Sequence, residues 1–195
     1  MDVTGVSGTS AIRVEVVPPI AWIVLDNAEH GNPIDRRFID EIENAWKNLA
    51  VNPDLRAVGV RSTGPSFSVG VQTYDGRPRG SIGPRAFGNW LPVLVELRGD
   101  IAAGAFELLG QADVIVSAPD VLLTVPADPA SRLDVQYLRP KVPEPELRRL
   151  ALIGAAHPMT ADRAAQLRLI DAIVPRQHLR RHSIKTLNEL AGGSH

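Results

Sequence analysis

Short apolar segments rich in β-branched residues alternate with segments of helical period, and this alternation limits the folds open to the chain. The first two apolar segments, residues 12–17 and 21–25, are separated by Pro18-Pro19, which cannot continue a strand pairing and marks a turn. Several later segments are apolar at nearly every position. Strands of that kind, separated by helices, form parallel sheets with crossover connections. The sequence therefore predicts an α/β fold with a largely parallel sheet.

The expected strands are residues 12–17, 21–25, 55–61, 67–71, 91–97, 114–116, 122–125 and 170–174. The expected helices are residues 33–50, 105–111, 146–152 and 161–167, with one short helix after residue 176. The best defined is 33–50, where apolar residues recur at steps of three and four. We expect a turn of small residues at 98–104 and no regular period from 127 to 145.

The domain organisation follows from size and composition. A hydrophobic content of 44% in 195 residues is enough for one core and too little for two full domains. We expect a flexible N-terminus at 1–11, one domain at 12–179 and a short C-terminal tail at 180–195. Residues 72–88 are rich in Gly, Pro and Arg, so we expect a weakly ordered loop there.

The charge balance argues against several classes of partner. With 21 basic and 22 acidic residues, the net charge of -1 provides no broad positive field for nucleic-acid binding. Cysteine is absent, which excludes disulfides, thiolate nucleophiles and cysteine-bound metals. The N-terminus lacks the pattern of a signal peptide, and the apolar runs are too short to span a bilayer. We therefore expect a cytoplasmic protein with no nucleic-acid or membrane partner.

Two glycine-containing segments follow predicted strands and carry the most informative residues. Residues 67–72 read FSVGVQ and follow the apolar segment 55–60, while residues 98–108 read RGDIAAGAFEL and follow the apolar segment 92–95. With residues 21–34, they resemble the enoyl-CoA hydratase/isomerase, or crotonase, family. Matching segments downstream at 112–117, 152–154, 160–161 and 167–175 extend this resemblance over about residues 13–179.

This resemblance implies a ClpP/crotonase-like fold of repeated ββα units, with a truncated C-terminal helical region. It also implies an oxyanion hole in which the backbone amides of Val71 and Gly104 donate to a thioester oxygen. Attack on a thioester carbonyl, or proton removal beside it, places negative charge on that oxygen. One such donor stabilises a transition state by about 3 to 4 kcal/mol in other systems.

The same resemblance implies further site residues. Glu107 falls where the family keeps one of two catalytic glutamates. The implied coenzyme A-binding residues are Asn32, Val69, Gly70 and Arg77. Gly31 replaces a basic residue that the family often places near coenzyme A. Arg77 could instead belong to a solvated basic loop with Arg79 and Arg85, since guanidinium groups suit either role.

The sequence departs from the family at the second catalytic carboxylate. Ala127 stands where hydratases carry the second glutamate, and Asp128 lies one position later. A shift of one residue along a strand turns a side chain to the opposite face, so catalysis by Asp128 requires a local bulge. Gln72 also replaces a usual aspartate. Hydration by two glutamates is therefore less expected than elimination, isomerisation or enolate chemistry with Glu107 alone.

Two functions follow from the resemblance. The first is an acyl-thioester lyase or isomerase that acts on an acyl-CoA or acyl-carrier thioester, for example by dehydration in a polyketide or dihydroxyphenylacetyl-CoA pathway. It would need no cofactor or metal beyond the coenzyme A in the substrate. The second is a non-catalytic or accessory subunit that binds the thioester and assists a larger synthase. The chain resembles small crotonase relatives of actinobacterial biosynthetic clusters, which include accessory proteins that assist formation of dihydroxyphenylacetyl-CoA from a polyketide thioester. Family members commonly assemble as trimers or pairs of trimers, so a homotrimer or hexamer is expected.

Overall fold

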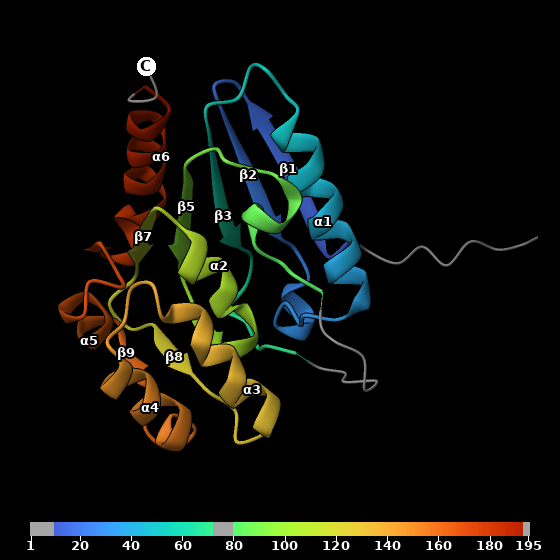
Figure 1. Cartoon of the computed structure of the whole chain (residues 1–195). Helices are drawn as coiled ribbons and strands as arrows, with labels where there is room; N and C mark the ends of the chain where they lie inside the picture. The colour runs from blue at the N-terminus through green and yellow to red at the C-terminus, as the bar shows by residue number, and fades with distance from the viewer. Residues whose placement is uncertain (1–9, 72–79, 193–195) are drawn as a thin grey trace, which may run out of the picture.

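A six-stranded sheet forms the centre of the fold in the computed structural model, which describes residues 10–71 and 80–192 (Figure 1). Its strands, in spatial order, are β1 (Ile12–Val17), β2 (Ile20–Leu25), β3 (Ala57–Ser62), β5 (Val93–Leu97), β7 (Val114–Ser117) and β10 (Ala172–Ile173). Strand β1 pairs antiparallel with β2, and every other pair is parallel. The predicted α/β class and largely parallel sheet are confirmed.

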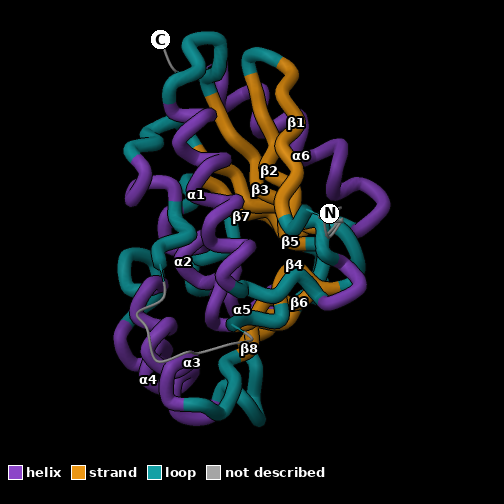
Figure 2. The backbone as a smooth tube through the Cα atoms, turned by 90° about the vertical axis from the view of Figure 1, so that its right-hand side faces the viewer, coloured by secondary structure: helices purple, strands orange, loops and turns teal. Residues whose placement is uncertain are grey.

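A second, smaller sheet lies below the first in the view of Figure 2. It orders β4 (Ser66–Ser68), β6 (Asp100–Ala102), β8 (Leu122–Thr124) and β9 (Met159–Thr160). Strands β4, β6 and β8 each follow a strand of the large sheet, so the chain repeatedly passes from one sheet to the other. The prediction of a turn at 98–104 is wrong, because the segment contains β6 and the short helix η3 (Ala103–Ala105). Strand β6 forms there because Asp100–Ala102 pairs in parallel with both β4 and β8.

Helices cover both faces of the large sheet (Figure 2). Helices α1 (Arg36–Ala50) and α2 (Phe106–Gln111) lie on one face, and α6 (Arg176–Gly192) lies on the other. The apolar stripe of α1 is buried as its sequence period predicts, and the Asp35 carboxylate caps its first turn by accepting from the Phe38 amide at 2.8 Å. Helix α6 runs through the domain boundary expected at residue 179 and contacts β2, β3, β5 and β7.

The remaining helices surround the small sheet. They are α3 (Pro129–Asp134), α4 (Glu144–Ile153) and α5 (Ala161–Gln166), with the short helices η1 (Ala28–His30), η2 (Pro84–Phe87) and η4 (Val135–Leu138) in connecting segments. Residues 127–145 were expected to lack a regular period, yet they contain α3 and η4. Helix α3 begins there because Asp128 caps it and Pro129 suits the first helical position.

Candidate functional site

Three backbone segments lie against one another beside the small sheet: residues 31–34, 68–71 and 102–104. The Val69 amide donates to the Gly31 carbonyl at 2.9 Å, and the Ile34 amide donates to the Gly70 carbonyl at 2.9 Å. An isolated parallel bridge also joins Ile34 to Val71. On the other side, Ser68 pairs with Ile101 in the register of β4 and β6. Segment 68–71 is therefore held on both sides by main-chain contacts.

Gly104 and Val71, the residues expected to supply the oxyanion donors, lie in van der Waals contact. A Cβ atom added at Gly104 would lie 2.9 Å from the Val71 amide nitrogen and 3.1 Å from the Gly70 Cα. A Cβ atom at Gly70 would lie 3.8 Å from the Gly104 amide nitrogen. Gly104 is buried and Val71 is partly exposed. The two loops thus place their backbone amides within one small region, although they are more than 30 residues apart.

Glu107 lies on α2, one turn beyond Gly104, and its side chain is buried. Its carboxylate accepts hydrogen bonds from the Ser81 hydroxyl, from the Ile82 amide at 3.1 Å and from the Gln111 side-chain amide at 3.3 Å. Sequence reasoning missed Ser81 and Gln111. The four-residue step from Glu107 to Gln111 on one helix face was a usable signal, whereas nothing in the sequence connects Ser81 to Glu107.

Asp128, the candidate replacement for the second glutamate, is an exposed helix cap. Its carboxylate accepts from the Ser131 amide at 2.9 Å, at the start of α3. Partial burial opposes its ionisation, but hydrogen bonds from Ser131 outweigh this effect and hold the pKa of Asp128 below its ordinary value. The Asp-Pro pair is a helix-start signal in the sequence itself. The side chain is therefore engaged in local structure.

The residues expected to contact coenzyme A have different surroundings. The Asn32 side chain is buried and bonded to three backbone groups: the Asn27 amide at 2.8 Å and the Thr63 and Ser66 carbonyls, each at 3.0 Å. Val69 is exposed and Gly70 is buried with φ of +88°. Arg77 lies outside the described residues. Asn32 is thus built into the scaffold of the site.

Gly31, which stands where the family often has a basic residue, adopts a left-handed backbone conformation. Its φ is +73°, and a Cβ atom there would lie 2.5 Å from the Val69 Cγ1 atom. Any side chain at this position would be strained and would collide with Val69. A larger residue at position 31 would therefore require the exposed Val69 side chain to move.

Over residues 10–71 and 80–192, no group of three or more His, Asp or Glu side chains is placed to hold a metal ion. In the same part of the chain, no helix is both long and apolar enough to cross a bilayer.

The two-sheet architecture, with a glycine in η3, just before α2, packed against the loop after β4, defines a crotonase-type fold. The sequence pattern of the enoyl-CoA hydratase/isomerase family matches residues 17–195. The chain belongs to this family.

Individual relatives are distant in sequence and close in fold. An enoyl-CoA hydratase/isomerase from Mycobacterium paratuberculosis superimposes with a TM-score of 0.82 at 21% identity, over 92% of this chain and 75% of that one. A probable enoyl-CoA hydratase from Mycobacterium thermoresistibile superimposes with a TM-score of 0.79 at 23% identity, over 93% of this chain and 81% of that one.

A curated relative has a different reaction in its name. The (7aS)-7a-methyl-1,5-dioxo-2,3,5,6,7,7a-hexahydro-1H-indene-carboxyl-CoA hydrolase of Rhodococcus jostii (strain RHA1) is 26% identical over 162 residues. The match covers 76% of this chain and 62% of that relative, so the chain spans less than two thirds of its length.

Proposed function

We propose that this protein binds an acyl-CoA thioester and stabilises its enolate, with the Val71 and Gly104 amides as oxyanion donors and Glu107 as the group that transfers a proton. The observation that carries the proposal is the contact between the Val71 and Gly104 backbones, one helical turn from a buried carboxylate. Membership of the enoyl-CoA hydratase/isomerase family supports a coenzyme A thioester as substrate. The names of the relatives support the same thioester class.

The proposed chemistry begins with proton removal from a carbon activated by the thioester. The proton passes to the Glu107 carboxylate, and the electrons of the broken C–H bond move to the thioester oxygen. Two fixed amide donors stabilise the resulting charge without reorganisation at the moment of reaction. Return of the proton at another carbon completes an isomerisation, whereas departure of a β-substituent completes an elimination.

The arrangement of carboxylates favours isomerisation, or elimination of a β-substituent other than hydroxide, over hydration by two glutamates, because loss of water is the reverse of that hydration. Asp128 is exposed and caps α3, and residue 127 is alanine. Hydration by the two-glutamate route needs a second carboxylate to orient water opposite Glu107. Substrates with a mobile double bond or a β-leaving group are therefore the first to test, including polyketide-type thioesters presented by coenzyme A or a carrier protein.

The alternative function is an accessory subunit that retains the thioester site and assists a larger synthase. The same absence of a carboxylate at residue 127 favours it. The two functions differ in one measurable property, because an accessory subunit binds acyl-CoA without converting it.

The decisive experiment compares wild type with Glu107→Gln on crotonyl-CoA, 3-hydroxybutyryl-CoA and 3-enoyl-CoA. We expect kcat to fall at least about 100-fold, because a positioned proton-transfer group contributes about 10² to 10⁴ in rate. Glu43→Gln is the matched control, since Glu43 is a surface residue on α1 that pairs with Lys47. Equal activity of wild type and Glu107→Gln would remove Glu107 from the mechanism.

Calorimetry with acyl-CoA decides between the two functions. Turnover by the isolated chain excludes the accessory function. Tight binding without turnover, together with co-purification of a larger synthase, would establish it.

A further inference from the structure

We propose that Asn32 and Ser68 are positioning residues that hold the Val71 amide in place against Gly104. The inference deepens the proposed function and rests on it, because it concerns the geometry of the same oxyanion site. Both side chains are buried. Both act through hydrogen bonds to the backbone segments that form the site.

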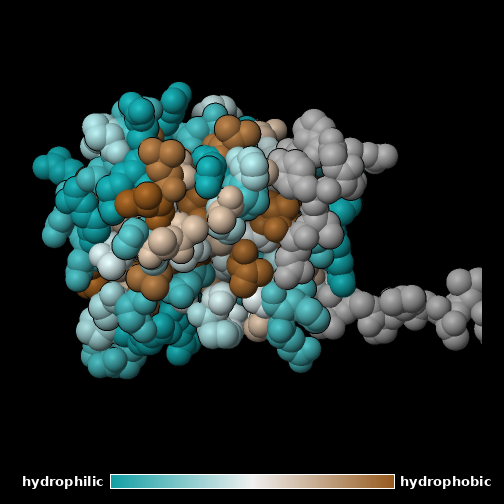
Figure 3. All heavy atoms as spheres, turned by 90° about the horizontal axis from the view of Figure 1, so that it is seen from below, coloured by the Kyte–Doolittle hydropathy of each residue, from teal (hydrophilic) through white to brown (hydrophobic). Residues whose placement is uncertain are grey.

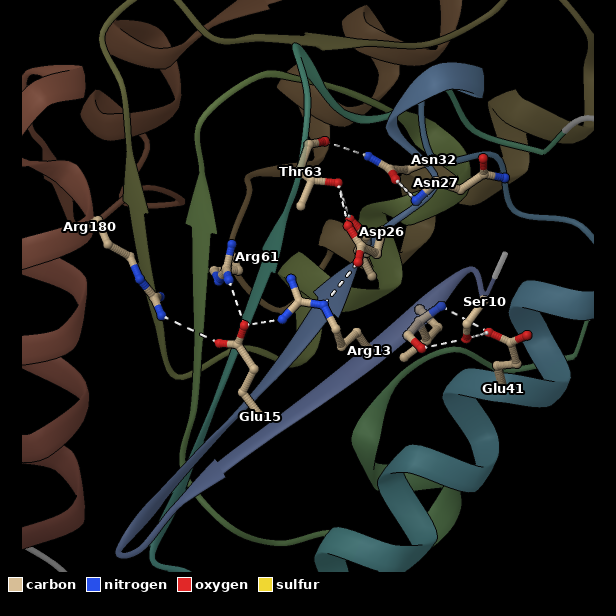
Figure 4. Close-up of polar contacts among 12 residues, drawn as sticks. Ser10, Arg13, Glu15, Asp26, Asn27, Asn32, Glu41, Arg61, Thr63 and Arg180 are labelled. Atoms are coloured by element: carbon tan, nitrogen blue, oxygen red, sulfur yellow. Dashed lines mark hydrogen bonds and ion pairs between the residues drawn. The ribbon is translucent and has the colours of Figure 1, made fainter. Parts of the chain in front are cut away.

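Asn32 joins two loops through its side chain. It is 1% exposed and has a φ of +54°, a left-handed conformation that few residues other than glycine adopt. Its oxygen accepts from the Asn27 amide, which closes the turn after β2. Its nitrogen donates to the Thr63 carbonyl (Figure 4) and to the Ser66 carbonyl, at the two ends of the connection between β3 and β4. A single buried amide thus fixes the loop after β2 to the start of β4.

Ser68 links Asn32 to the backbone of segment 68–71, which contains Val71. Its hydroxyl donates to the Asn32 carbonyl at 2.8 Å and accepts from the Gly70 amide at 3.1 Å. Ser68 is also 1% exposed, so both hydrogen bonds are shielded from water. Val71 follows directly after the Gly70 amide that Ser68 holds. A continuous path of hydrogen bonds therefore runs from Asn32 to Gly70, the residue before Val71, and adds to the main-chain bond from the Ile34 amide to the Gly70 carbonyl.

The path is anchored in the large sheet. The Thr63 hydroxyl donates to the Asp26 carboxylate at 3.0 Å and to the Leu25 carbonyl at 3.2 Å. The Asp26 carboxylate in turn accepts from the Arg13 guanidinium at 2.9 Å (Figure 4). Since Arg13 lies on β1 and Leu25 on β2, the carbonyl of Thr63 that Asn32 binds is held by two neighbouring strands.

Removal of either side chain should loosen the Val71 amide without removing it. A catalytic group displaced by about 1 Å can lose about 100-fold in rate. Oxyanion contacts strengthen as charge develops on the substrate oxygen, so their misplacement lowers kcat more than it weakens substrate binding. An exclusively structural role would instead change stability and leave the rate of the folded protein unchanged.

The test uses Ser68→Ala, which removes one hydroxyl, and Asn32→Gly, which removes the side chain but permits the positive φ. Two matched controls remove similar groups elsewhere. Ser117→Ala deletes a buried hydroxyl that bonds the Ala118 carbonyl at 2.9 Å, and Asn52→Gly deletes a side chain that accepts from the Asp54 amide at 3.0 Å. If Asn32→Gly does not fold, Ser68→Ala alone decides the outcome.

Two measurements are made on each folded variant. Steady-state kinetics should show kcat lowered by about 10- to 100-fold in Ser68→Ala and Asn32→Gly, with KM within about threefold of wild type. Difference infrared spectroscopy with crotonyl-CoA labelled with ¹³C at the carbonyl should show a smaller shift of the bound carbonyl stretch in both variants than in wild type. Both controls should match wild type.

Three results would count against the inference. An unchanged kcat and carbonyl shift in folded Ser68→Ala would overturn it while leaving the proposed function intact. A loss of kcat in Ser117→Ala equal to that in Ser68→Ala would also overturn it, because the effect would then be general loosening. No carbonyl shift in wild type would refute the oxyanion site itself, and the positioning role with it.

Discussion

Gly104 allows two loops of the candidate site to approach each other closely because glycine has no side chain. The residue lies in the short helix η3, with a backbone conformation that alanine adopts equally well. The constraint is therefore contact: the space where a Cβ atom would stand is filled by the Val71 amide, the Val71 Cγ2 atom and the Gly70 Cα. Backbone atoms cannot rotate away as the end of a flexible side chain can, so a larger residue must separate the two loops.

Gly104→Ala is expected to impair activity far more than it impairs folding. Separation of the loops displaces one donor relative to the other, and we expect kcat to fall about 100-fold or more. Overpacking of this kind costs about 1 to 3 kcal/mol in the free energy of unfolding. Steady-state kinetics and urea denaturation measure the two effects. Gly192→Ala is the control, because no atom lies within 4 Å of a Cβ atom placed at residue 192. Wild-type activity in Gly104→Ala would show that the close contact between the two loops is not needed for activity.

Among the elements, α6 contacts the sheet through an arginine that lies against an aromatic ring and a carboxylate, in addition to apolar packing. The Arg180 guanidinium lies 3.9 Å from the centroid of the Trp22 ring and 3.6 Å from the Glu96 carboxylate (Figure 4 shows the Arg180 side chain extending from α6 towards the sheet). Glu96 on β5 is only 4% exposed. Burial lowers the pKa of Arg180, and the nearby Glu96 carboxylate opposes that shift. The pair stabilises α6 only if both partners are present.

Arg180→Met is expected to destabilise the protein by about 1 to 3 kcal/mol, because it leaves the buried Glu96 carboxylate without its cation, whereas the Arg180 guanidinium is itself partly exposed to solvent. The double variant Arg180→Met/Glu96→Leu should recover most of this loss, since two apolar groups replace a buried ion pair at little cost. Urea denaturation measures all three unfolding free energies. Arg36→Met, which breaks an exposed pair with Asp40 on α1, is the control and should change stability by less than about 0.5 kcal/mol. A similarly small effect in Arg180→Met would show that the pair does not hold α6.

On the scale of the whole molecule, the repeated passage from the large sheet to the small one creates the candidate site. Strands β3 and β4 lead into segment 68–71, and β5 and β6 lead into segment 102–104. Because β4 and β6 are neighbours in the small sheet, their following loops emerge side by side. The position of the site is thus a consequence of strand order.

The expected homotrimer or hexamer stays a prediction. Exposed apolar side chains occur at the α3 and α4 end of the molecule, namely Leu133, Leu152 and Ile153. The face seen from below carries hydrophobic side chains among hydrophilic ones (Figure 3). Burial of such side chains between copies is a common reason for self-association. Size-exclusion chromatography with light scattering should give three or six times the 21.1 kDa chain mass. A monomer at micromolar concentration would contradict the prediction.

The sequence by itself determined the features that depend on local pattern. The apolar period of residues 33–50 predicted the helix that the structure has at Arg36–Ala50, and the alternation of segments predicted an α/β fold. The three-residue step from Gly104 to Glu107 placed a carboxylate one turn from the glycine. These features follow from helix and strand geometry, which repeats over a few residues.

Only the tertiary structure decided which distant groups meet. Ser81 and Glu107 are 26 residues apart, and Ser68 and Asn32 are 36 apart, so no local period connects them. Asp128 could be placed near a catalytic position by alignment, but its carboxylate forms a hydrogen bond at the start of α3 instead. Such contacts depend on strand order and loop packing. Local preferences allow several arrangements of these loops, and the summed free energy of many long-range interactions selects one of them.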